Sequence, residues 1–146
     1  MSEIQINLEA IRERISAAAK RSGRAVADVE LLAVSKTKPV EILQEAVEAG
    51  QLAFGENRVQ EILLKHPQLP SKLRWHLIGP LQSNKVRKVL PLVEMIHAVD
   101  SLAIAKDINR IAGELGLHPK VLIEINVAAE SSKHGFSPDQ IREDLE

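Results

Sequence analysis

A lysine follows closely on an apolar run near the start of the chain. Residues 31–34 have the length and composition of a strand buried on both faces, and Lys36 comes two residues later. In α/β proteins with parallel sheets, ligands bind at the carboxyl ends of the strands. An amine held there against apolar neighbours is less easily charged than one in water, so it can attack an aldehyde or ketone. The pattern indicates an imine-forming lysine; the alternative is a solvated lysine in a strand-to-helix loop.

Alternating strand and helix patterns would position this lysine. An amphipathic helix is expected first, because Ile4, Leu8, Ile11 and Ile15 recur every three or four residues. Five apolar strand segments follow, centred near residues 32, 53, 76, 97 and 123, and a helix pattern comes after each. Spacings of about 21 to 26 residues accommodate one strand, one turn and one helix, so the chain predicts βα units and a parallel sheet.

Two architectures fit this order, a doubly wound open sheet and a TIM-type (β/α) barrel. The chain has no P-loop and no Gly-x-Gly-x-x-Gly after the first strand, which disfavours a nucleotide-binding open sheet. A complete eight-unit barrel needs about 250 residues. The 146 residues therefore predict one domain, 1–146, formed by a leading helix and the first five βα units of a barrel. Because such a piece has two open strand edges, we expect the natural protein to be longer.

Composition excludes several classes of function. Net charge is −1 and aromatic residues make up 2%, so there is neither the basic surface nor the stacking platform of a nucleic-acid-binding protein. The absence of cysteine excludes disulfides and thiolate chemistry. With 45% hydrophobic and 27% charged residues, no signal-peptide pattern and no apolar run of about 20 residues, we expect a cytoplasmic protein that does not enter membranes.

Five short blocks stand at the predicted strand ends. They are residues 33–39 (AVSKTKP), 54–61 (FGENRVQE), 75–85 (WHLIGPLQSNK), 96–100 (IHAVD), and Ile125-Asn126 followed by Glu130, Lys133 and Gly135. Together these blocks resemble the pyridoxal phosphate homeostasis proteins, whose fold is like the N-terminal barrel of alanine racemase. The resemblance runs from the leading helix to Gly135 and implies an alanine racemase N-terminal-like barrel.

The resemblance also implies the site. Lys36 would hold pyridoxal 5′-phosphate (PLP) as an internal aldimine, and Asn57 would border the cofactor, where its amide can reach the 3-oxygen or the aldimine region. The alternative for Asn57 is a helix N-cap. The family binds the phosphate through its last βα units, which this sequence does not contain, so we expect this chain alone to bind PLP poorly.

Four further residues match the family pattern but have simpler interpretations. His76 and His97 are expected to be hydrogen-bonded histidines of the barrel interior. Lys38 and Lys133 are expected to be solvated loop lysines, although a second lysine could receive the cofactor during transfer.

Two functions compete. The first is a non-enzymatic carrier that sequesters PLP, passes it to PLP-dependent apoenzymes and so affects amino-acid and keto-acid balance. The second is a PLP-dependent racemase or decarboxylase. Enzymes that resemble alanine racemase work as dimers and take a tyrosine base from a second domain, whereas this chain has no tyrosine. The resemblance therefore favours a monomeric carrier. A regulatory module that docks on a partner is a third possibility.

Overall fold

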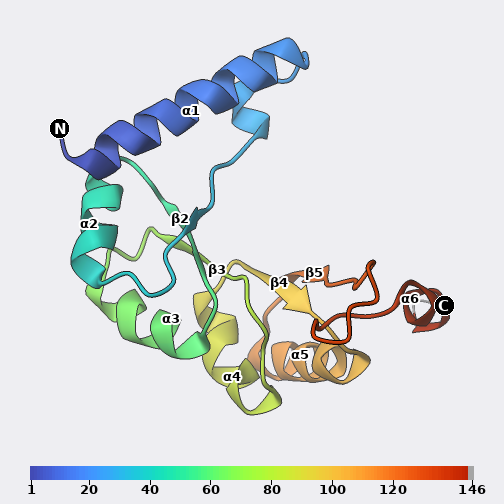
Figure 1. Ribbon diagram of the computed structural model, residues 1–146. Coiled ribbons are helices and arrows are strands. Elements are labelled where there is room, and N and C mark those ends of the chain that lie inside the picture. Colours follow the sequence, from blue (N-terminus) through green and yellow to red (C-terminus); the bar gives the residue numbers. More distant parts are fainter. Residues whose placement is uncertain (145–146) are drawn as a thin grey trace.

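Five parallel strands form one sheet in the computed structural model, which describes residues 1–144 (Figure 1). The strands are β1 (Ala33–Val34), β2 (Ala53–Glu56), β3 (Arg74–Leu77), β4 (Met95–Val99) and β5 (Lys120–Ile123). Their order in the sheet is their order in the chain, and each strand is parallel to the next. A parallel pair needs a crossover connection, and in this chain each crossover contains a helix.

The helices are α1 (Glu3–Arg21), α2 (Val40–Glu48), α3 (Val59–Lys65), α4 (Val86–Val89), α5 (Leu102–Leu115) and α6 (Pro138–Asp144). Short 3₁₀ turns occupy Val26–Asp28, His66–Gln68, Ser83–Lys85 and Leu90–Leu92. Because the strand order never reverses, right-handed crossovers place α2 to α5 on the same face of the sheet, as Figure 1 shows. A doubly wound sheet would reverse its order. The expected TIM-type arrangement, with five βα units after a leading helix, is confirmed. Among these helices, none is long and apolar enough to cross a membrane.

Local sequence signals set several of the helix ends. Helix α5 begins where the Ser101 hydroxyl accepts a hydrogen bond from the Ile104 N–H (3.3 Å), and it ends at Gly116, whose φ of 66° is left-handed. The capping box before α6 is present, because the Ser137 N–H donates to Gln140 Oε1 (2.9 Å) and the Gln140 N–H donates to Ser137 Oγ (3.2 Å). Pro39 stands at the N-cap of α2.

The main core lies between the sheet and its helices. The rings of Phe54 and Trp75 pair across β2 and β3 with centroids 5.9 Å apart, and both residues are 1% exposed. Leu77 and Ile96 pair across β3 and β4 and are fully buried. These side chains belong to one cluster with helix residues, among them Leu43, Ile62, Val86, Val89 and Ile108. The core is therefore largely aliphatic, as the scarcity of aromatic residues indicated.

The first and last strands differ from expectation. The segment 31–34 was expected to be a strand buried on both faces, but β1 is only Ala33–Val34 and Val34 is 55% exposed. Strand β1 is an edge strand of the described sheet, paired with β2 alone, and one of its faces is uncovered. Strand β5 ends at Ile123, the residue near which the fifth segment was expected to be centred, and Phe136 returns to form an isolated bridge with Ile125.

Candidate functional site

Lys36 and Asn57 both lie at the carboxyl edge of the sheet. Val34 pairs with Gly55, and the Ser35 N–H continues this pairing beyond β1 by donating to the Gly55 carbonyl (3.0 Å). Lys36 lies in the turn that follows β1, and Asn57 lies in the bend that follows β2. The fold thus places both candidate residues just beyond the carboxyl ends of paired strands, although they are 21 positions apart in the chain.

The expectation that Lys36 is kept partly dry is wrong for the described residues. Ser35 is 3% exposed and its hydroxyl faces the helix side, where it donates to Glu56 Oε1 (2.7 Å). Lys36 lies in the turn that follows Ser35, and it is exposed. The sequence could not show that Lys36 is exposed. The apolar run before it indicated a strand covered on both faces, whereas in the structure only the helix-side face of β1 is covered.

Apolar side chains lie beside Gly55 on the face of the sheet opposite the helices, hereafter the open face. A Cβ atom added at Gly55 would lie 3.2 Å from two side-chain atoms of Ile78 and 3.5 Å from Leu32, so both side chains pack directly over this glycine. Leu32 and Ile78 are each half-buried. A flat ring bound next to Lys36 would therefore meet an aliphatic surface as well as polar groups.

Two histidines lie on β3 and β4 near this surface. His76 Nδ1 and His97 Nε2 are 2.8 Å apart, and His76 is 8% exposed. The expectation of interior, hydrogen-bonded histidines is confirmed for this pair. Burial, followed by repulsion from His97, lowers the pKa of His76, and burial lowers the pKa of His97. The buried Nε2 atom of His76 has no hydrogen-bond partner among the described residues, so a polar atom is available next to the site.

Asn57 is held by close backbone packing. A Cβ atom at Gly79 would lie 2.3 Å from the Asn57 carbonyl oxygen and 2.9 Å from its Cα, so only glycine fits at this position. The interpretation of Asn57 as a helix cap is wrong, because α3 begins at Val59 with Arg58 as its N-cap and has no side-chain cap. Asn57 is half-buried and lines a hollow of about 930 Å³ at the strand ends, together with Arg58, Gln82, Lys85, Asp100 and His134. Lys36 does not line this hollow.

A buried ion cluster behind Lys36 was not anticipated from the sequence. Lys65 Nζ donates to Glu56 Oε1 (2.6 Å), to Glu61 Oε2 (2.8 Å) and to the Ser35 carbonyl (2.9 Å). The Thr37 N–H donates to Glu61 Oε2 (2.8 Å). The spacing of Glu61 and Lys65, four residues apart on one helix, is a signal that could have been found in the sequence. No pattern in the sequence shows that Glu56 is fully buried.

The two carboxylates of this cluster are perturbed in opposite directions. Burial raises the pKa of Glu56, since water is excluded from its carboxylate. The hydrogen bond from Lys65 lowers the pKa of Glu61, which keeps part of its contact with solvent. Lys65 is therefore the positive charge on which both carboxylates depend.

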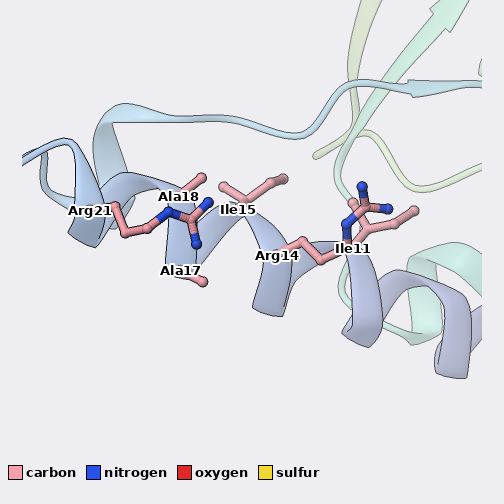
Figure 2. A pocket seen from close by; sticks show the side chains of 6 residues that line it. All are labelled: Ile11, Arg14, Ile15, Ala17, Ala18 and Arg21. Carbon is pink, nitrogen blue, oxygen red and sulfur yellow. The ribbon is translucent and has the colours of Figure 1, made fainter.

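The remaining candidate positions lack the features of a catalytic or binding site. Lys38 is exposed, and exposed Lys133 pairs with Glu130 at 3.0 Å, so both are solvated lysines as expected. Residues 1–144 contain no group of three or more His, Cys, Asp or Glu side chains that could hold a metal ion. A hollow on α1 is lined by that helix alone, and Figure 2 shows its residues: Ile11, Arg14, Ile15, Ala17, Ala18 and Arg21. It lacks a nucleophile or an acid, and none of the candidate site residues lines it.

Comparisons with known proteins agree with this architecture. Residues 6–146 match the family model described as alanine racemase, N-terminal domain. A Vibrio cholerae protein named pyridoxal phosphate homeostasis protein is 46% identical over 149 residues, covering 97% of this chain and 62% of the relative. The chain thus spans about 62% of the length of this curated relative.

Two solved structures are also similar. PipY of Synechococcus elongatus PCC7942 is 44% identical, with 92% of this chain and 62% of PipY covered; its TM-score is 0.77 without PLP and 0.74 with PLP bound. A Bifidobacterium adolescentis protein described as unknown is 38% identical with a TM-score of 0.85, covering 96% of this chain and 62% of that protein.

Proposed function

Because the chain belongs to the alanine racemase N-terminal domain family, we propose that it binds PLP through Lys36 and acts in the homeostasis of this cofactor. The observation that carries the proposal is the position of an exposed Lys36 just after the carboxyl end of β1, at the same edge of the sheet as Asn57. PipY, at 44% identity, has a structure with PLP bound, and the Vibrio cholerae relative is named for PLP homeostasis.

The residues present fit the aldehyde and ring of PLP. Lys36 provides an exposed amine, and His76 Nε2, which has no hydrogen-bond partner among the described residues, lies on β3, two strands away. Leu32 and Ile78 provide an apolar surface beside them. In the proposed binding step the neutral amine of Lys36 adds to the aldehyde carbon, and loss of one water molecule leaves a C=N bond without any change of oxidation state. Asn57 borders the bound ring from the next strand.

We favour a carrier over an enzyme. The exposed setting of Lys36 suits release of the cofactor as well as capture. The carrier would act in the cytoplasm as a monomer and deliver PLP to apoenzymes. In this proposal residues 1–146 are the N-terminal part of one barrel domain, and groups outside them hold the phosphate.

The experiment compares the full-length protein with its Lys36→Ala variant after incubation with PLP. We expect the wild type to show the visible absorbance of a protonated imine. Borohydride should reduce this C=N bond and leave the PLP group attached to the peptide that contains Lys36. Lys72→Ala is the matched control, because Lys72 is also exposed but precedes β3 at the opposite edge of the sheet. Equal labelling of the Lys36→Ala variant would refute the assignment. Racemised or decarboxylated L-amino acids, formed faster than with free PLP, would refute the carrier function.

A further inference from the structure

The ion cluster of Lys65, Glu56 and Glu61, hereafter the Lys65 cluster, lies directly behind the loop that presents Lys36. Its side chains are 4%, 0% and 21% exposed, respectively. Glu56 ends β2, whereas Glu61 and Lys65 come from α3, so the cluster joins the sheet to the helix that follows. A lysine and a glutamate are rarely buried this completely unless they are paired.

The cluster holds the backbone on both sides of Lys36. Lys65 Nζ donates to the carbonyl of Ser35, the residue before Lys36 (2.9 Å). Glu61 Oε2 accepts from the N–H of Thr37, the residue after it (2.8 Å). The two peptide segments that flank Lys36 are thus fixed by one pair of neighbouring side chains. Lys36 itself makes no hydrogen bond or ion pair with its side chain among the described residues.

The loop needs such support because its conformation is strained. Thr37 has a φ of 63°, in the left-handed region that β-branched residues rarely adopt. Strained residues of this kind persist where surrounding contacts over-determine them, and they concentrate at functional sites. The Lys38 N–H donates to the Ser35 carbonyl (3.1 Å), which closes the turn around Lys36.

Stability alone does not explain a buried ion cluster. Taking charges out of water is costly, and well-packed hydrophobic residues of similar volume often stabilise a protein as well or better. In this cluster Glu56 Oε2 is buried without a hydrogen-bond partner among the described residues, so the arrangement is not fully compensated. Its distinctive result is a fixed geometry for the loop of residues 35–37.

We propose that the Lys65 cluster is a positioning device, in which Lys65 and Glu61 fix the loop so that Lys36 meets the PLP aldehyde in a reactive orientation. This inference rests on the proposed role of Lys36. Lys65 and Glu61 are positioning residues, since neither is placed in contact with the cofactor. Removing them should slow formation of the C=N bond, because the amine must then be ordered at each encounter.

The test uses Glu61→Ala in the full-length protein, since Glu61 is the most exposed member of the cluster and its variant is the safest for folding. The rate constant for imine formation, followed by stopped-flow absorbance, should fall roughly tenfold to a hundredfold. Glu61→Gln keeps an oxygen acceptor for the Thr37 N–H and should recover much of the rate. Ser101→Ala, which removes the N-cap of distant α5, is the control for general destabilisation. Equal slowing by Ser101→Ala would overturn the proposal.

A second readout does not involve PLP. In the apo protein, trypsin should cut the Lys36–Thr37 bond faster in Glu61→Ala than in wild type, whereas the cut after Lys72 should be unchanged. If trypsin cuts the variant faster, the result supports the positioning role of the Lys65 cluster. If in the same experiments the wild type binds no PLP, the proposed function is refuted while the role of the cluster stands. If the wild type binds PLP at Lys36 while Glu61→Ala matches its imine-formation rate and its cleavage rate, the cluster does not position the loop.

Discussion

The contact between Gly79 and Asn57 allows a sharp test with one methyl group. The Cβ atom of a Gly79→Ala variant would lie 2.3 Å from the Asn57 carbonyl oxygen and 2.9 Å from its Cα. Both atoms belong to the backbone, so neither can move away by a side-chain rotation. The variant must therefore shift the connection after β2, the end of β3, or both.

The loss in the free energy of unfolding can be estimated from substitutions of the same kind in other proteins. Overpacking a well-packed interior costs about 1–3 kcal/mol, and a clash with backbone belongs at the upper end of that range. We expect Gly79→Ala to lower the free energy of unfolding by about 2–3 kcal/mol, which corresponds to roughly 6–9 °C in Tm for a chain of this size class. Because the clash is with the backbone of Asn57, we also expect the variant to bind PLP more weakly than wild type.

Gly113→Ala is the matched control. Gly113 lies within α5, and no atom stands within 4 Å of a Cβ added there. Alanine in a helix interior is favoured over glycine by about 0.5–1 kcal/mol, so this variant should be as stable as wild type or more stable. Urea denaturation monitored by circular dichroism measures both variants. A Gly79→Ala variant with wild-type stability would refute the close packing of Gly79 against Asn57.

Two further predictions concern pH and packing. Burial lowers the pKa of His76 from its ordinary value of 6.5, so below that pH the unfolded state binds more protons than the folded state. The free energy of unfolding therefore decreases as pH falls from about 6.5 toward the folded-state pKa, by up to about 1.4 kcal/mol per pH unit. His76→Gln should flatten that dependence in denaturation from about pH 5 to 7.5, whereas exposed His118→Gln should not. Leu77 is fully buried, so Leu77→Ala should lower the free energy of unfolding, measured by urea denaturation, by about 2–5 kcal/mol. Leu64 is 62% exposed, so Leu64→Ala should lower it by less than about 0.5 kcal/mol. Equal losses would contradict the packing.

Local signals allowed much of the fold to be predicted. Ser101, Gly116 and the Ser137–Gln140 capping box mark helix ends, because a cap is formed within three or four residues of chain. The repeat of strand and helix patterns similarly predicted a parallel sheet. Since parallel strands all end at one edge, residues that follow neighbouring strands stand at the same edge, as Lys36 and Asn57 do.

Long-range packing decided the rest. The burial of Lys65 depends on how α3 lies against β2, and its bond to Ser35 joins residues 30 positions apart, so no periodic pattern records it. The approach of Gly79 to Asn57 and the exposure of Lys36 likewise depend on which elements cover which face of the sheet. The sequence by itself determined where the candidate imine-forming lysine stands along the chain, because strand and turn signals are local. Only the tertiary structure decided which groups surround that lysine, because burial and charge pairing are properties of segments brought together by folding.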